Sequence, residues 1–195
     1  MKNVLSRFFL VLLLSSASLA IAADKKADSS PNTNPKVILE TDLGKITIEL
    51  FEKEAPITVA NFLAYIDSHF YEGVIFHRVV PGFVVQAGGL TYDFQRKETL
   101  PEIKNEADNG LLNLEGTLSM ARTSDPDSAS SQFFINLKDN ENLDRTEEKA
   151  GYAVFGKVTE GMDTVRKIEK EPRGLYRNFP EAPNFAVRIL KAYRL

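Results

Sequence analysis

The sequence lacks cysteine and tryptophan, and it contains only two histidines among its 195 residues. Without cysteine, a disulfide bond, a thiolate nucleophile and a cysteine-bound zinc ion are excluded. His69 and His77 have no neighbouring cluster of further ligands, so we expect both to be structural and expect no metal or other cofactor. No Ser–His–acid arrangement is recognisable around the Ser-rich loop at residues 122–131, which disfavours a serine hydrolase.

An excess of positive charge is also missing, because 24 Lys and Arg residues face 27 Asp and Glu residues for a net charge of −3. Binding to phosphate backbones depends on such an excess, so a nucleic-acid-binding barrel is disfavoured and no nucleic acid partner is expected. The hydrophobic and charged fractions, 43% and 26%, are ordinary for a soluble globular protein, and the length favours one domain.

The apolar run at residues 8–14 is too short for a comfortable transmembrane helix. It follows Lys2 and Arg7 and precedes a small-x-small site at residues 20–22, a pattern typical of a secretory signal peptide. We therefore predict a signal peptide over residues 1–22, export, and no membrane attachment after cleavage. An uncleaved anchor is the alternative, whereas the lack of cysteine excludes a lipoprotein.

Residues 23–35 are rich in Lys, Asp, Ser, Asn and Pro and lack apolar residues for a core, which predicts a flexible linker. The globular domain is then expected over residues 36–195. The long, polar and irregular stretch at residues 90–114 is uncommon in a compact domain, and it is either functional or an elaborated surface loop.

Short β-type segments bounded by turn residues recur through the domain, and residues 36–41 and 45–50 predict the first hairpin. Pro56 suits the first position of a helix, and apolar residues follow it at helical spacing. These residues, which we expect to be buried, are Val59, Phe62, Leu63 and Ile66, and a second helix is marked by Met162, Val165 and Ile168. Many short strands with two helices predict a mainly β fold, either a sandwich or a barrel.

The stretch at residues 76–89, FHRVVPGFVVQAGG, places two apolar runs on either side of a Pro81–Gly82 turn and predicts a hairpin. Arg78 on the first run and Gln86 on the second are the polar side chains that a ligand could use. Alternation along the strands, with a turn near Gly82, would set Arg78 opposite Gln86 on an apolar floor.

This stretch resembles the signature of the cyclophilin-type peptidyl-prolyl cis-trans isomerases. Residues 116–136, GTLSMARTSDPDSASSQFFIN, and residues 152–158, YAVFGKV, resemble two further blocks of that family. IKNEADNGL at residues 103–111 and EGMD at residues 160–163 are similar to its bacterial periplasmic branch. The resemblance implies a closed eight-stranded antiparallel β-barrel capped by two α-helices, with the substrate groove on its outside, in a periplasmic protein.

The family accelerates rotation about the peptide bond before proline, a barrier of about 18–20 kcal/mol that arises from amide resonance. The reaction needs neither nucleophile nor metal, only a site that favours the twisted amide, and Arg78 matches the main catalytic residue. By resemblance, the substrate-binding positions, including an apolar proline pocket, are Phe83, Val84, Gln86, Ala121, Arg122, Gln132, Phe134, Leu143 and Tyr152.

Within that groove, the resemblance implies that Gln86 holds a substrate carbonyl and that the backbone of Ala121 and Arg122 binds the residues before proline. Arg122 stands where many relatives carry Asn, a change that a backbone contact tolerates. Val84 stands where many carry Met, which predicts a shallower and stiffer pocket floor. Tyr152 occupies a rim position where many relatives carry His.

The implied partners are proline-containing unfolded or newly exported polypeptides, and a monomer is expected. Asn142 falls where the animal proteins carry Trp, so the resemblance implies weak cyclosporin binding. A proline-peptide binding module or holdase with little turnover is the alternative function. The presence of Arg78 favours the isomerase, because binding alone would not require a donor at the twisted nitrogen.

Overall fold

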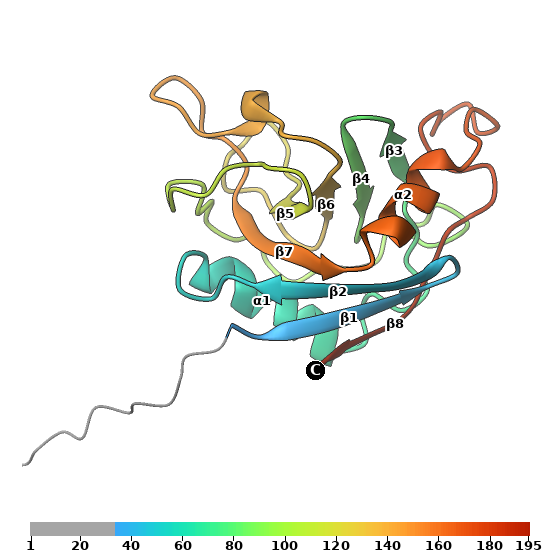
Figure 1. Cartoon of the computed structure of the whole chain (residues 1–195), viewed down its shortest axis with the longest axis horizontal. Helices are drawn as coiled ribbons and strands as arrows, with labels where there is room; N and C mark the ends of the chain where they lie inside the picture. Colours follow the sequence, from blue (N-terminus) through green and yellow to red (C-terminus); the bar gives the residue numbers. More distant parts are fainter. Residues whose placement is uncertain (1–33) are drawn as a thin grey trace, which may run out of the picture. The chain divides into compact units, whose positions relative to one another are not determined.

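The computed structural model describes residues 34–195; the predicted signal peptide and most of the predicted linker lie outside them. No helix within this described range is long and apolar enough to span a bilayer. The strands are β1 (Lys36–Thr41), β2 (Gly44–Leu50), β3 (Arg78–Val80), β4 (Val84–Ala87), β5 (Thr117–Met120), β6 (Phe133–Asn136), β7 (Val154–Glu160) and β8 (Ile189–Arg194), and the helices are α1 (Pro56–Asp67), the 3-10 turn η1 (Glu141–Leu143) and α2 (Met162–Lys170) (Figure 1).

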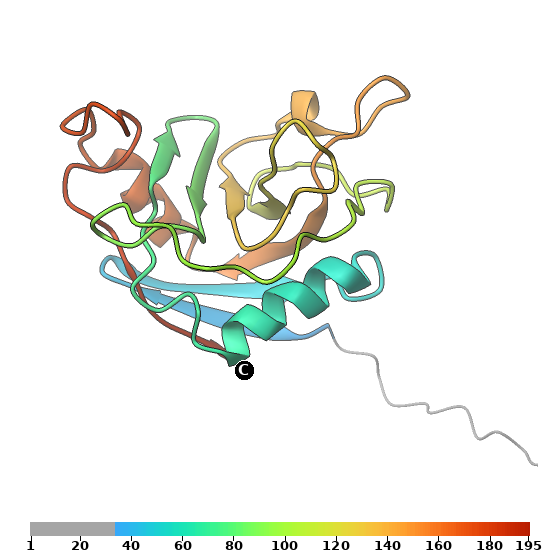
Figure 2. The same cartoon turned by 180° about the vertical axis from the view of Figure 1, so that it is seen from behind.

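The eight strands form one antiparallel sheet in the order β3-β4-β6-β5-β7-β2-β1-β8, curled into a half-barrel (Figures 1 and 2). The expectation of a closed barrel is wrong, because the end strands β3 and β8 do not pair with each other in residues 34–195. The outer edge of β3 is taken up by the loop between α2 and β8, since Val79 N–H donates to Glu181 O at 2.8 Å. The chain before β3 instead meets the chain around the start of β8, where Ile189 N–H donates to Val74 O at 2.8 Å and Phe76 N–H donates to Val187 O at 2.9 Å.

Helix α1 begins at Pro56 as predicted, because the fixed φ of proline suits the first helical turn. The free backbone N–H groups of Ile57 and Thr58 donate to the Glu106 carboxylate at 3.0 and 2.7 Å. A residue of the long polar loop therefore caps the helix. The predicted apolar residues of α1 are buried, as are Val165 and Ile168 of α2, which packs against β2, β3 and β4.

The core lies on the inner face of the curled sheet and is rich in aromatic rings. The ring centroid of Phe133 on β6 lies 5.4 Å from that of Phe62 on α1 and 5.6 Å from that of Tyr71. Tyr71 is fully buried, and its hydroxyl donates to Ser131 O at 2.9 Å. Because side chains alternate along a strand, Phe134 faces the outside of the sheet, which is where the candidate site lies.

Strands β3 and β4 form the hairpin predicted from the Pro81–Gly82 turn, and their register pairs Arg78 with Gln86. Gly82 has a φ of +63°, in the left-handed region that favours glycine. Its N–H donates to Oε1 of Glu169 on α2 at 2.8 Å. This bond pins the tip of the hairpin to α2.

Candidate active site

A hollow of about 320 Å³ opens on the outer face of the sheet, beside β3, β4 and β6. All the predicted site residues except Gln132 line it, although they come from distant parts of the chain. The lining residues are Arg78, Phe83, Val84, Gln86, Ala121, Arg122, Phe134, Leu143 and Tyr152. We call this hollow the apolar pocket, because five of its nine lining residues are Phe or aliphatic.

Arg78 is one of two arginines that line the apolar pocket, and 38% of its side chain is exposed. Its Nε donates to Oε2 of Glu181 at 2.6 Å. Glu181 lies in the loop between α2 and β8, and nothing in the sequence pattern linked it to Arg78. A guanidinium presents five N–H donors in a rigid fork, so the two terminal nitrogens remain to serve a ligand.

Gln86 is oriented by Gln132, whose Oε1 accepts a hydrogen bond from Gln86 Nε2 at 2.9 Å. Gln132, which was predicted to contact substrate, lies beside the apolar pocket, where it holds the Gln86 amide and lines a neighbouring polar pocket. Gly89 leaves space for Gln132, because a Cβ at Gly89 would lie 2.7 Å from Gln132 Nε2. The closing glycine of the hairpin signature therefore supports the site.

The floor of the apolar pocket consists of side chains with almost no exposure. Val84 is 2% exposed and Phe134 is 5% exposed. The Phe134 ring meets the Tyr152 ring edge-on, with centroids 5.7 Å apart and planes at 75°. Tyr152 is tied in turn to η1, since its N–H donates to Leu143 O at 3.0 Å. The floor of the pocket is therefore apolar and suits an apolar group of a ligand.

A buried polar network that the sequence analysis missed fixes the far wall of the pocket. Asn136 Oδ1 accepts from Asn140 Nδ2 at 2.8 Å, and Asn140 Nδ2 also donates to Phe83 O at 3.0 Å. Asn136 Nδ2 donates to Asn113 Oδ1 at 3.3 Å, and Asn113 donates from its side chain to Asp144 Oδ1 at 2.8 Å. The network joins the segment that carries Phe83 to the turn that carries Leu143.

Arg122 contributes its side chain as well as its backbone. Its Nε donates to Gly151 O at 3.1 Å, and its guanidinium carbon lies 4.5 Å from the centroid of the Tyr152 ring. Ala121 N–H donates to Gln132 O at 2.9 Å. Arg122 therefore stabilises the rim of the pocket by a cation–π contact, in addition to the backbone role expected for it.

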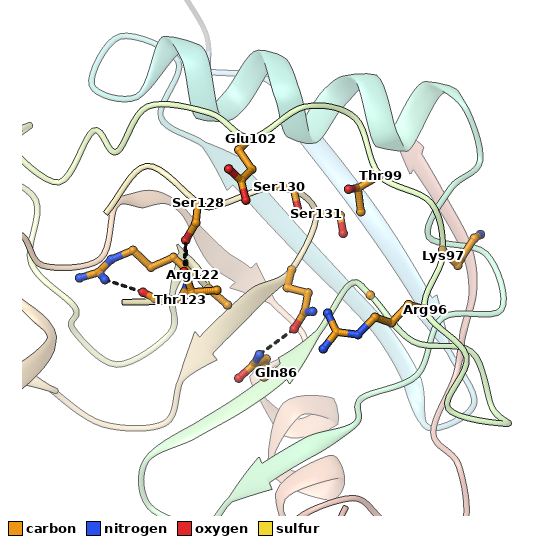
Figure 3. A pocket seen from close by; sticks show the side chains of 13 residues that line it. Gln86, Arg96, Lys97, Thr99, Glu102, Arg122, Thr123, Ser128, Ser130 and Ser131 are labelled. Atoms are coloured by element: carbon orange, nitrogen blue, oxygen red, sulfur yellow. Dashed lines mark hydrogen bonds between the residues drawn. The ribbon is translucent and has the colours of Figure 1, made fainter. Parts of the chain in front are cut away.

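A second, polar pocket of about 410 Å³ adjoins the first and shares Gln86, Ala121 and Arg122 with it. Figure 3 shows its side chains, with Arg96 and Lys97 on one side and Arg122 on the other. The polar pocket also contains one carboxylate, Glu102, and several hydroxyl groups. The site is thus a groove with an apolar half and a polar half, divided at Gln86.

His77 is buried, and its Nδ1 finds no hydrogen-bond partner among residues 34–195. Burial, together with the nearby charge of Arg78, lowers the pKa of His77 from 6.5 to about 4. The imidazole is therefore neutral at neutral pH. His69 is exposed and contacts Glu72, and the described residues contain no metal-binding group of three His, Asp or Glu side chains.

Comparisons with known proteins agree with this geometry. Residues 36–194 match the family model "Cyclophilin type peptidyl-prolyl cis-trans isomerase/CLD". The chain is 49% identical over 185 residues to peptidyl-prolyl cis-trans isomerase A of Dickeya dadantii, covering 93% of each protein. It is 49% identical over 136 residues to peptidyl-prolyl cis-trans isomerase B of Escherichia coli, covering 68% of this chain and 83% of that protein.

Solved structures show the same fold. A Cryptosporidium parvum cyclophilin type peptidyl-prolyl cis-trans isomerase superposes with a TM-score of 0.70 at 26% identity, covering 83% of this chain and 98% of that one. A structure of that protein in the presence of the dipeptide Ala-Pro superposes with a TM-score of 0.68 at 27% identity, covering 81% and 97%.

Proposed function

The chain belongs to the cyclophilin-type peptidyl-prolyl cis-trans isomerases, and from this premise we propose that it is exported and accelerates X-Pro isomerisation in exported polypeptides, with Arg78 as its catalytic residue. The observation that carries the mechanism is the convergence of Arg78 with an apolar pocket on the outer face of the sheet. The clients would be unfolded or newly exported chains, and the enzyme would act as a monomer without a cofactor.

The chemistry follows from the amide bond itself. Twisting the X-Pro bond releases the nitrogen lone pair from resonance, so a donor aimed at the prolyl nitrogen stabilises the twisted form more than the planar one. The terminal nitrogens of Arg78 would supply that donor. The twisted amide is also less polar than the planar amide, so the apolar floor around Phe134 favours it further.

The rest of the groove would hold the peptide while the bond rotates. Gln86, fixed by Gln132, would bind the substrate carbonyl, and the backbone at Ala121 and Arg122 would bind the residues before proline. The structural relative solved in the presence of Ala-Pro supports a proline-containing ligand for this class of groove.

Export rests on the pattern of residues 1–22 and on the similarity to the bacterial enzymes. The mature chain would begin at or near Ala23, and the periplasm would be its compartment. Cell fractionation followed by N-terminal sequencing tests this: intact Met1 in the membrane fraction would contradict it.

A protease-coupled assay with an Ala-Pro peptide tests the catalytic proposal on the mature chain. Acceleration of the slow cleavage phase in the presence of a chelator is the expected result. Binding of the peptide without acceleration would instead identify a proline-peptide binding module or holdase.

A further inference from the structure

β3 has no neighbouring strand on its outer side. The loop between α2 and β8, residues 171–188, lies along that edge instead. β3 is an edge strand, and Val79 N–H donates across that edge to Glu181 O at 2.8 Å (Figure 1). The bond places Glu181 beside the backbone of the strand that carries Arg78. The carboxylate of Glu181 then reaches Arg78 Nε.

The loop is held in place independently of this ion pair. The Phe179 ring stacks on Phe94, with centroids 4.4 Å apart and planes at 14°. Asn184 N–H donates to Pro172 O at 2.7 Å, and Leu175 N–H donates to Asn184 Oδ1 at 2.9 Å. These contacts hold the loop that carries Glu181, so its carboxylate is a hydrogen-bond acceptor at a fixed position beside Arg78.

The contact falls on the one nitrogen of the guanidinium that lies nearest the side-chain stem. A carboxylate at Nε restricts rotation of the guanidinium plane while it leaves both terminal nitrogens unbonded by it. Orientation matters because a catalytic donor works only when it is aimed at the atom where charge develops. The bond is charge-assisted, and such bonds are shorter and stronger than neutral ones.

We propose that Glu181 is a positioning residue, which holds Nε of Arg78 so that its terminal nitrogens face the apolar pocket. This inference rests on the proposed catalytic role of Arg78. Glu181 does not line the pocket, so it would act through Arg78 and not by contact with the peptide.

The test compares Glu181→Ala and Glu181→Gln with the unmodified enzyme. Both partners are partly exposed, at 38% and 46%, so the expected loss in kcat is modest, about two- to fivefold for Glu181→Ala. Glu181→Gln should lose less, because its side-chain oxygen still accepts. KM for the peptide should be unchanged in both. Asp67→Asn is the control, since Asp67 forms a comparable, partly exposed pair with Arg194 and neither residue lines the groove, and it should retain full activity.

Two readouts separate positioning from a general structural effect. Glu181→Ala in an Arg78→Lys background should have no further effect on kcat, because lysine has no Nε–H group to hold. The 15N–1H signal of Arg78 Nε, assigned by its absence in Arg78→Lys, should shift and exchange faster with water in Glu181→Ala.

Full activity of Glu181→Ala, with Arg78→Ala inactive, would overturn the inference and leave the proposed function standing. Full activity of Arg78→Ala would overturn both.

Discussion

Phe133 and Phe134 are neighbours on β6, and at 0% and 5% exposure both are buried, yet they lie on opposite faces of the sheet. Phe133 packs against Phe62 and Tyr71 in the core, whereas Phe134 lines the apolar pocket beside Tyr152. Burial alone therefore does not distinguish a core residue from a binding residue here. The distinction comes from what else shares the face, which is aromatic rings on the inside and Arg78 and Gln86 on the outside.

The most direct test of the different roles of Phe133 and Phe134 is to replace each ring with alanine in turn. Phe133→Ala should lower the free energy of unfolding by about 3–5 kcal/mol, because it leaves a cavity in a closely packed core. Phe134→Ala opens a space that water already reaches, so it should cost less stability and reduce kcat/KM. Urea denaturation and the peptide assay on both variants decide it. Equal destabilisation with normal activity in Phe134→Ala would place that ring in the core.

Substitutions of Arg78 test the role of the polar side chains on the outer face of the sheet. Arg78→Ala should keep the fold and lose ~10²–10³ in rate, or about 3–4 kcal/mol of transition-state stabilisation, as removal of one preorganised donor typically does. Arg78→Lys should lose most of that activity too, because an ammonium does not reproduce the planar fork. The measurement is kcat/KM with circular dichroism as the check on folding. Near-normal turnover in both variants would refute the mechanism.

His77, which precedes Arg78 in the sequence, is buried, and its lowered pKa should make the stability of the fold depend on pH. Its folded pKa of about 4 lies below the ordinary value of 6.5, so the unfolded chain takes up the proton first as pH falls. Stability should therefore be lost between about pH 6.5 and pH 4, by about 3 kcal/mol from this group. Carboxylates titrate in the same range, so the readout is the difference between the unmodified protein and His77→Gln in urea unfolding. Parallel pH profiles would show that His77 does not carry this effect.

The smallest expected effect concerns the rim of the outer face. Asn142 is exposed in η1 next to Leu143. From the family resemblance we predict that it occupies the position of the Trp that animal relatives place against cyclosporin. We expect weak cyclosporin inhibition with normal isomerase activity, and tighter inhibition by about 2 kcal/mol in Asn142→Trp, as for a typical aromatic anchor. An inhibition titration on both proteins measures it. Tight inhibition of the unmodified protein would contradict the assignment of this position.

Local patterns in the sequence were enough for part of the fold. The Pro81–Gly82 turn and strand alternation predicted that Arg78 faces Gln86, and the start of α1 at Pro56 was predicted from the fixed φ of proline. Helical spacing predicted which residues α1 buries. In each case the deciding contacts lie within one element or across one tight turn.

The features that the sequence left undetermined depend on contacts between distant loops. The two ends of the sheet meet through backbone hydrogen bonds between the chain around Val74 and the start of β8 at Ile189. Glu181 contacts Arg78 from a loop with no periodic sequence pattern. The network of Asn113, Asn136 and Asn140 likewise joins the loop before β5 to β6 and the turn that follows it. A polar residue in an irregular loop has the same local pattern whether it faces solvent or a buried partner, so only the folded chain identifies it.

The contacts at the edge of the sheet also have a consequence for how the groove assembles. Glu181 bonds to Arg78 although the two residues lie 103 positions apart in the sequence. Until the segment that carries Glu181 and Ile189 joins this edge, Arg78 would stand on a strand without a partner on its outer side. Because contacts between distant parts of a chain form slowly, the groove would be completed in a late step of folding.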